Sequence, residues 1–499
     1  MNPTKRALLA QLMILSALTP FAALSQVLNE DADATPTAMM NRFLAALNSG
    51  KRDVLRLFLA SNFQLNSNAD GRLEDITEQN WRLFTLNEGL DLERVVSVRP
   101  AAITVLVRGR ATGIWSEMSL FMTAQAPDYI LPAPPNKIVG MGLSDQTAPA
   151  DTLPCKPLGD HEIAGRLDAL VKRLVTADAF SGVVHVARHG KPVYAHAFGL
   201  ADRRWNISNR VDTRFYLASI TKMFTAVAIA QLVARGKLSW EDKVGRLIPD
   251  YPNRDVADHV SVRQLLSHTS GLIGARALAD KTPLSYDRKT VAAQLALFIN
   301  DPLEFRPGER FGYSNAGFIL LGAIIEKTSG QDYFSYVHDH VFTPAGMSDT
   351  GHFELDTDPP NMATGYMDTP GGRRDNIFRL EVKGGPDTGA YSNGADMAKF
   401  QRALMDGTLL DRQSLDTMWQ KPASPDQIYG LGADVETYNG QPVIGHGGGR
   451  MGATNRFEFY PDLGYSVTIL SNIDCEPQTI AYRLREWITQ GRAVTCVST

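Results

Sequence analysis

The sequence predicts two consecutive α+β domains. The chain has 499 residues, which is more than one hydrophobic core usually supports. Over residues 35–145 apolar residues first recur at helical spacing and then alternate, as in helices followed by an antiparallel sheet. A proline-containing linker is expected at 146–160, and beyond it β patterns stand on both sides of a helical middle. The larger domain is therefore expected over residues 161–499.

Composition is that of an ordinary globular protein. Hydrophobic residues make up 44% of the chain and charged residues 21%, so a large core is available. The formal net charge of -4 is spread without long runs of like charge, and no basic stripe suits a phosphate backbone. We expect no nucleic-acid partner, and the motifs below require no cofactor.

Residues 1–25 have the pattern of a secretory signal. Lys5 and Arg6 form a charged start, residues 7–22 are mostly apolar, and Ala23-Leu24-Ser25 supplies small residues for cleavage. The alternative is a membrane anchor, but the apolar stretch is short for a span of about 20 residues and contains Pro20. We expect export to the periplasm or the medium, with no membrane span after cleavage.

Three cysteines occur, Cys155, Cys475 and Cys496, and none lies in a Cys-x-x-Cys pair. This spacing does not suggest zinc binding or thiol redox chemistry. One disulfide is possible in an oxidising compartment, and all three pairings stay open.

The smaller domain begins with helices. They are predicted over 35–48, over 52–59 and around Trp81 and Phe84. Four alternating stretches then predict strands at Val95–Val98, Ile103–Val107, Met118–Met122 and Ile138–Met141. Helices leading into a curved antiparallel sheet resemble the NTF2-like cone fold.

Histidine is absent from this first domain, since the first one in the chain is His161. The commonest general base is therefore missing, which favours a binding or spacer role. A pocket enzyme that uses Asp or Glu is the alternative.

The larger domain alternates strands and helices. Strands are predicted at Gly182–Ala187, Pro192–Gly199 and Gly464–Asn472, and a buried helix at Ser219–Arg235. Separated β segments around a helical middle indicate an α+β or α/β architecture.

The first segment with chemistry is Ser219-Ile220-Thr221-Lys222, at the start of the predicted buried helix. A spacing of three puts the serine hydroxyl and the lysine amine on one helical face. Apolar neighbours such as Met223 and Phe224 would desolvate the amine, which helps it to assist proton removal from Ser219. A capping serine followed by a surface lysine is the plainer interpretation of this pattern alone.

Two further segments follow in order. Tyr313-Ser314-Asn315 precedes an apolar helix at Ala316–Lys327, and His446-Gly447-Gly448-Gly449 precedes two alternating strands, Ala453–Tyr460 and Ser466–Asn472. A second copy, Tyr391-Ser392-Asn393, competes with the first. We favour Tyr313 because a helix is expected after it, whereas Gly394-Ala395-Asp396 follows the copy.

The three segments, in this order, resemble the serine β-lactamase and penicillin-binding-protein family, which includes class C β-lactamases, D-alanyl-D-alanine carboxypeptidases and family VIII esterases. The segments Leu265–Leu272 and Gly384–Asp396 also look typical of it. The resemblance spans residues 161–488 and implies an antiparallel sheet flanked by helices, with a helical lobe.

The resemblance also implies roles. Ser219 would be the nucleophile, Lys222 its activating partner and Tyr313 the group that accepts and returns the proton. Asn315 would hold the substrate carbonyl or amide, and the strand from His446 through Gly448 and Gly449 would line the site. The backbone N–H groups of Ser219 and Gly449 would form the oxyanion hole.

His446 stands where true β-lactamases carry a lysine that helps to bind the substrate carboxylate. A mostly neutral imidazole binds an anion less strongly, although Arg450 could replace the lost charge. We therefore expect slow or absent β-lactam turnover and favour an esterase or D-amino-acid peptidase that acts on a small-molecule or peptide ester or amide.

The sequence also allows three other interpretations. Ala390–Gly394 lacks the first glycine of a Gly-x-Ser-x-Gly hydrolase, and His338-Asp339-His340 is better explained as solvated surface than as a metal site. His268 is expected to be structural.

The strongest alternative is a sensor or penicillin-binding-like protein that binds cell-wall peptides or acyl compounds without turnover. The sequence does not predict the oligomeric state.

Overall fold

The computed structural model describes residues 35–64, 69–123, 137–149, 152–280, 288–357, 359–369, 371–422, 427–475 and 477–492. The chain divides into two compact units, Met1–Pro149 and Ala150–Thr499. The boundary between them lies within the stretch 146–160 that the sequence predicts as a linker. The predicted secretory segment lies outside the described residues.

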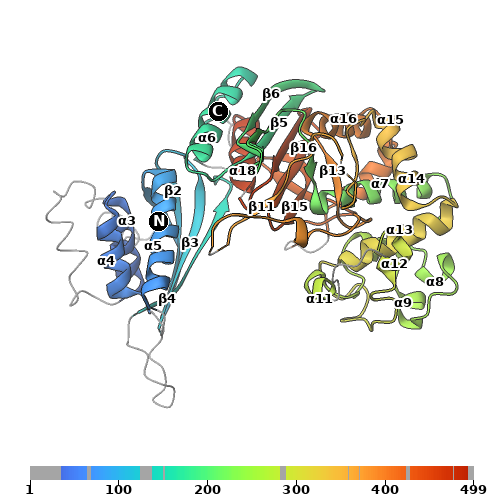
Figure 1. Ribbon diagram of the computed structural model, residues 1–499, viewed down its shortest axis with the longest axis horizontal. Coiled ribbons are helices and arrows are strands. Elements are labelled where there is room, and N and C mark those ends of the chain that lie inside the picture. The colour runs from blue at the N-terminus through green and yellow to red at the C-terminus, as the bar shows by residue number, and fades with distance from the viewer. Residues whose placement is uncertain are drawn as a thin grey trace, which may run out of the picture. The chain divides into compact units, whose positions relative to one another are not determined.

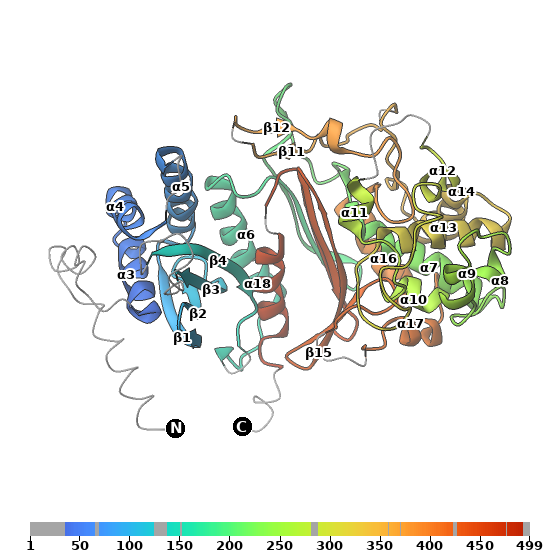
Figure 2. The same ribbon diagram turned by 90° about the horizontal axis from the view of Figure 1, so that it is seen from below.

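Within its described residues, the first unit contains three helices and a four-stranded antiparallel sheet (Figures 1 and 2). The helices are α3 (Pro36–Asn48), α4 (Arg52–Asn62) and α5 (Ala69–Asn87). The strands are β1 (Leu90–Arg99), β2 (Ala102–Gly109), β3 (Trp115–Met122) and β4 (Ile138–Gln146), paired in that order.

The apolar periodicity of this unit explains its fold. Thr35 caps the first helix through the N–H of Ala38, and Phe43 and Phe58 meet in the core with ring centroids 6.0 Å apart. Register shifts in the β1–β2 and β3–β4 pairs bend the strands. The predicted order of helices and strands is confirmed, whereas the NTF2-like assignment stays a prediction.

The second unit is built on a six-stranded antiparallel sheet. Its strand order is β14 (Asp434–Tyr438), β15 (Gln441–Arg450), β16 (Ala453–Tyr460), β17 (Tyr465–Ser471), β5 (Gly182–Arg188) and β6 (Lys191–Phe198). The colours of Figure 1 place the early strands β5 and β6 directly beside the late ones. The three strands predicted in this unit and the β16–β17 pair are confirmed.

Helices cover both faces of this sheet (Figure 2). The helices α6 (Asp160–Thr176) and α18 (Pro477–Thr489) lie together on one face, and α7 (Thr221–Ala234) and α16 (Gly394–Met405) lie on the other. Helix α7 is buried almost all round, as its apolar sequence requires. The nucleophile segment is therefore anchored in the core.

A cluster of buried charges ties α18 to the sheet. Arg485 of α18 contacts Glu436 at 2.7 Å and Glu458 at 2.8 Å, and Arg456 contacts the same two carboxylates. Burial alone would raise the pKa of Glu458, but Arg485 and Arg456 lower it to about 2. The carboxylate therefore stays ionised inside the sheet.

The remaining helices form a lobe beside α7 (Figures 1 and 2). Its members are α8 (Val244–Leu247), α9 (Arg254–His259), α10 (Val262–Leu266), α11 (Ala275–Asp280), α12 (Val291–Leu295), α13 (Asn315–Ser329) and α14 (Tyr333–Val337). Smaller elements complete the unit: β7 (Leu200–Asp202), β8 (Ile207–Ser208), β9 (Phe215–Tyr216), η3 (Ala218–Ile220), η4 (His338–Phe342), α15 (Thr343–Ala345), β10 (Gly351–His352), β11 (Tyr366–Met367), β12 (Arg374–Asp375), η5 (Ile377–Arg379), β13 (Ala390–Ser392) and α17 (Arg412–Met418).

Two local expectations were wrong. The helix predicted from Ser219 begins as the 3-10 turn η3, and α7 starts at Thr221. A helix also follows the second Tyr-Ser-Asn copy, because Asn393 caps α16 by accepting from the N–H of Asp396 at 2.9 Å. The following helix therefore does not distinguish Tyr313 from Tyr391, and only the geometry of the site can.

Within the described residues, no helix is both long and apolar enough to cross a bilayer. Cys155 is disulfide-bonded, and the Sγ of Cys475 lies 3.2 Å from the hydroxyl of Thr454. Cys496 lies outside the described residues.

Candidate active site

Ser219 lies on a constrained turn between β9 and α7. The residue before it, Ala218, has a φ of 50°, a left-handed conformation that costs a non-glycine residue roughly 1–2 kcal/mol. Neighbouring strands hold the turn, since Leu217 N–H donates to the carbonyl of Ala390 at 2.8 Å and the Asn455 side chain donates to the carbonyl of Tyr216 at 3.0 Å. The backbone thus fixes the position of the serine hydroxyl.

Lys222, one turn further on, is fully buried. Its Nζ lies 3.2 Å from Ser219 Oγ, 2.9 Å from Asn315 Oδ1 and 2.6 Å from the carbonyl of Asp387. An ammonium has three N–H donors, so these three oxygens match its charged form. The predicted contact between Ser219 and Lys222 is present, and Asn315 joins it.

The loop that carries Tyr313 is held by His268. The Nδ1 of this buried histidine accepts from the N–H of Ser314 at 3.1 Å, and its carbonyl accepts from the N–H of Gly312 at 2.8 Å. Burial lowers the pKa of His268 well below its usual value, with Lys222 and His446 adding to the effect. The neutral ring fits the structural role predicted for it.

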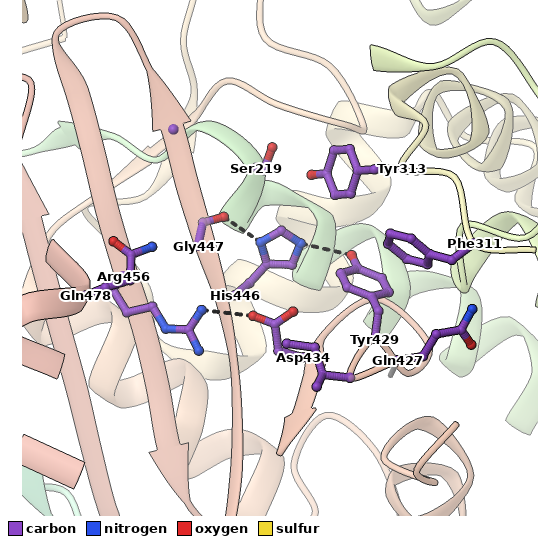
Figure 3. A pocket seen from close by; sticks show the side chains of 12 residues that line it. Ser219, Phe311, Tyr313, Gln427, Tyr429, Asp434, His446, Gly447, Arg456 and Gln478 are labelled. Atoms are coloured by element: carbon purple, nitrogen blue, oxygen red, sulfur yellow. Dashed lines mark hydrogen bonds and ion pairs between the residues drawn. The ribbon is translucent and has the colours of Figure 1, made fainter. Parts of the chain in front are cut away.

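Tyr313 faces the nucleophile. Its ring centroid lies 5.0 Å from Lys222 Nζ, and Figure 3 shows its hydroxyl pointing toward Ser219. Tyr391 of the competing copy instead lies on β13, where it pairs with Tyr216 and Gly351. The geometry therefore favours Tyr313 as the tyrosine of the site.

Strand β15 passes beside the nucleophile. Its pairing with β14 ends at Gly445 opposite Asp434, while its pairing with β16 continues through Gly449 to Arg450. A Cβ on Gly448 would lie 2.1 Å from the carbonyl oxygen of Leu217, whereas one on Gly449 would meet nothing within 4 Å. Gly448 thus allows the strand to approach the serine turn, and Gly449 borders the pocket.

His446 lies in the same strand and is almost fully buried. Its Nδ1 lies 2.5 Å from the carbonyl oxygen of Gly447, so this nitrogen is the donor, and its Nε2 accepts from the Tyr429 hydroxyl at 2.9 Å. Burial, together with the charge of Lys222, lowers the pKa of His446 to about 3. The imidazole is neutral at pH 7 and both nitrogens already have partners.

A pocket of about 550 Å³ opens in front of Ser219 (Figure 3). Its lining residues come from the serine turn, from the segments before α13 and β14, from the sheet and from α18: Ser219, Phe311, Tyr313, Gln427, Ile428, Tyr429, Asp434, His446, Gly447, Gly449, Arg456 and Gln478. One wall is aromatic, and Asp434 and Arg456 form a charged end.

A second set of charges contacts Tyr216, three residues before Ser219. Arg450 pairs with Glu381 at 2.6 Å, and Glu381 also accepts from the Tyr216 hydroxyl at 2.5 Å. Burial raises the pKa of the neighbouring Asp387 to about 6, although Lys222 opposes the shift. Arg450 is thus already paired and does not line the pocket, contrary to the suggestion that it replaces a missing lysine.

Most of the predicted site residues therefore converge. Ser219, Lys222 and Asn315 are linked by hydrogen bonds, and Tyr313, His446 and Gly449 line the same pocket as Ser219. Gly448 differs from the prediction, because it faces the backbone of Leu217 and not the pocket. Among the described residues, no group of three or more His, Cys, Asp or Glu side chains could hold a metal ion.

Sequence reasoning missed several pocket residues, namely Phe311, Gln427, Tyr429, Asp434, Arg456 and Gln478. No local motif marks them, because they come from separate loops, strands and helices. Only Phe311 had a usable signal, since it stands two residues before Tyr313.

The sequence profile of the β-lactamase family matches residues 167–487. The chain belongs to the β-lactamase family. The match covers most of the second unit, and the resemblance inferred from the three motifs is confirmed.

Relatives within the β-lactamase family include hydrolases. Esterase EstB of Burkholderia gladioli is 37% identical over 223 residues, which cover 41% of this chain and 55% of EstB. A D-aminopeptidase of Brucella anthropi is 26% identical over 316 residues, which cover 61% of this chain and 58% of that enzyme. Both matches span little more than half of the relative.

Solved structures of the family agree with the fold. The crystal structure of a penicillin-binding protein from Bacillus halodurans superposes with a TM-score of 0.57 at 32% identity, covering 66% of this chain and 99% of that one. The predicted fold class, an antiparallel sheet flanked by helices, is confirmed for the second unit.

Replacing Gly448 by alanine tests the close approach of β15 to the serine turn. The added Cβ would press on the backbone of Leu217, and no rotamer change can relieve that contact. We expect Gly448→Ala to lower the free energy of unfolding by about 1–3 kcal/mol in chemical denaturation. Gly449→Ala is the matched control, with a change of less than about 0.5 kcal/mol. Equal effects of the two substitutions would contradict this account.

The lowered pKa of His446 predicts an acid-dependent loss of stability. The unfolded chain binds a proton at this side chain below pH 6.5, whereas the folded chain does so only near pH 3. Between these values the wild type should lose about 1.4 kcal/mol of unfolding free energy per pH unit relative to His446→Gln. Denaturation of both proteins from pH 7 to pH 4.5 measures the difference, and a difference independent of pH would show that His446 titrates normally.

Proposed function

We propose that this β-lactamase-family protein is an exported serine hydrolase that cleaves a small-molecule or peptide ester or amide through an acyl-enzyme on Ser219. The observation that carries the proposal is the buried Lys222 amine, which contacts Ser219 Oγ at 3.2 Å and Asn315 Oδ1 at 2.9 Å. Burial of a charged lysine is costly unless hydrogen bonds or an opposite charge compensate it. Here its contacts reach a hydroxyl that opens onto a pocket.

In acylation, Ser219 Oγ attacks the substrate carbonyl carbon and the bond to the leaving group breaks. Tyr313 accepts the serine proton and returns it to the leaving alcohol or amine. Lys222 donates to Ser219 Oγ, so as an ammonium it stabilises the developing alkoxide, and its Nζ lies 5.0 Å from the ring centroid of Tyr313, the group that carries the proton. Water then attacks the acyl-enzyme, Tyr313 takes the water proton and returns it to Ser219, and a carboxylic acid is released.

The oxyanion of each tetrahedral intermediate is assigned to the backbone N–H groups of Ser219 and Gly449. Both residues border the pocket, and Gly448 allows β15 to lie close to the serine turn. A donor of this kind contributes about 3 kcal/mol to the transition state.

Three observations support an esterase or D-amino-acid peptidase over a β-lactamase, whose substrates carry a carboxylate. His446 is held neutral by burial, and Arg450 is paired with Glu381. Arg456, the cation that lines the pocket, already contacts three carboxylates. The described part of the pocket therefore offers a substrate carboxylate only weak attraction. The similarity to esterase EstB and to a D-aminopeptidase agrees with this choice.

Covalent labelling tests the nucleophile. A fluorophosphonate probe should add once to the mature wild type, and p-nitrophenyl butyrate should be hydrolysed, because Ser219 is activated by Lys222. Both signals should vanish in Ser219→Ala, as measured by intact-mass spectrometry and by the release of p-nitrophenol. A folded wild type that neither acquires an adduct nor hydrolyses the ester would instead favour a sensor that binds cell-wall peptides or acyl compounds.

Removal of the Tyr313 hydroxyl tests the proton carrier. Tyr313→Phe should lower kcat for p-nitrophenyl butyrate by about 10²- to 10⁴-fold, the usual contribution of general acid–base catalysis. Tyr391→Phe, from the second copy of the motif, is the matched control and should retain wild-type kcat. The reverse outcome would assign the proton transfer to Tyr391.

A further inference from the structure

The end of the pocket away from Ser219 carries a carboxylate beside aromatic rings (Figure 3). Asp434, at the start of β14, lines the pocket together with Phe311 and Tyr429 (Figure 3). The rings of Phe311 and Tyr429 have centroids 6.2 Å apart and are inclined by 52°. None of these three residues takes part in the acyl transfer described above.

The charges around Asp434 do not cancel. Arg456 contacts Asp434 at 2.8 Å, Glu436 at 3.3 Å and Glu458 at 3.1 Å, and Arg485 contacts the latter two carboxylates. Three carboxylates and two guanidinium groups leave one excess negative charge. Asp434 is the carboxylate of this set that borders the pocket.

Arg456 does not reverse this charge at the pocket wall. Its Nη1, Nη2 and Nε atoms each contact one of the three carboxylates. Its side chain is only 8% exposed, compared with 16% for that of Asp434. An incoming anion would have to displace an existing ion pair, whereas an incoming cation would relieve the excess negative charge.

The aromatic wall suits the same kind of ligand. Phe311, Tyr313 and Tyr429 present three aromatic side chains to the pocket, and an organic cation is attracted to the faces of such rings. The Tyr429 hydroxyl is already donated to His446, so its ring is held in place. A carboxylate with aromatic neighbours is the arrangement that recognises a substituted ammonium group.

We propose that this end of the pocket binds an ammonium group on the leaving group of the substrate, so that esters of cationic amino alcohols are the preferred class. The proposal rests on the proposed function. The leaving side is assigned because Tyr313, which returns the proton to the leaving group, is next to the aromatic rings of this end, with its ring centroid 6.4 Å from that of Tyr429.

A pair of esters that differ only in charge tests the proposal. Butyrylcholine and its neutral carbon isostere, 3,3-dimethylbutyl butyrate, share the same acyl group and nearly the same shape. With the mature wild type, a pH-stat assay should give a kcat/KM at least about tenfold higher for the cationic ester. A ratio near one, or a preference for the neutral ester, would overturn the proposal.

Asp434→Asn removes the charge and keeps the shape of the side chain. It should reduce the ratio of kcat/KM for butyrylcholine to kcat/KM for the neutral ester from at least about tenfold to within about twofold. Asp416→Asn is the matched control, because it removes one negative charge from an exposed ion pair on α17, and it should retain the wild-type ratio. An unaltered ratio in a folded Asp434→Asn protein would assign the preference to other groups.

The two proposals can fail separately. Turnover of p-nitrophenyl butyrate without any cationic preference would refute the ammonium site alone. If no ester is hydrolysed, saturation-transfer NMR of Ser219→Ala with choline and with 3,3-dimethylbutanol decides the point, since binding of choline alone supports the site and equal or absent binding refutes it. If Asp434→Asn does not fold, the proposal is tested by the wild-type ratio of kcat/KM for the two esters and by the NMR comparison of choline with 3,3-dimethylbutanol.

Discussion

The buried ammonium of Lys222 is the interaction on which the rest of the site depends. Its three oxygen partners come from three separate parts of the fold: Ser219 from the turn before α7, Asn315 from the start of α13 and Asp387 from the segment before β13. A charge buried in the core is tolerated only when such partners satisfy it. Placing Lys222 correctly therefore requires that the lobe, the sheet and the nucleophile turn meet in one arrangement.

Backbone geometry is the second constraint. The left-handed conformation of Ala218 and the absence of a side chain at Gly448 bring the nucleophile turn and β15 together. Strain of this kind persists only where the surroundings determine the conformation, and here hydrogen bonds from β13 and β16 do so. The backbone position of Ser219, and not an unusual residue type, prepares its hydroxyl for nucleophilic attack.

The charge along the pocket changes from one end to the other. Lys222 supplies a cation at the nucleophile, His446 is neutral in the middle, and Asp434 leaves the excess negative charge at the far end. The β-lactamase members of the family bind anionic substrates. In this protein, by contrast, one end of the pocket carries an excess negative charge. Fold and catalytic residues can thus be shared while the choice of substrate differs.

The sequence by itself determined the two-unit organisation, the order of the strands along the chain and the family, because hydrophobic periodicity and the spacing of Ser219, Lys222 and Tyr313 are local properties. It gave no valid reason to choose Tyr313 over Tyr391, because a helix follows each of the two Tyr-Ser-Asn segments. It also missed Asp434 and Tyr429. Only the tertiary structure decided these points, because pairing across the sheet and contacts with the lobe bring together residues that no local pattern links.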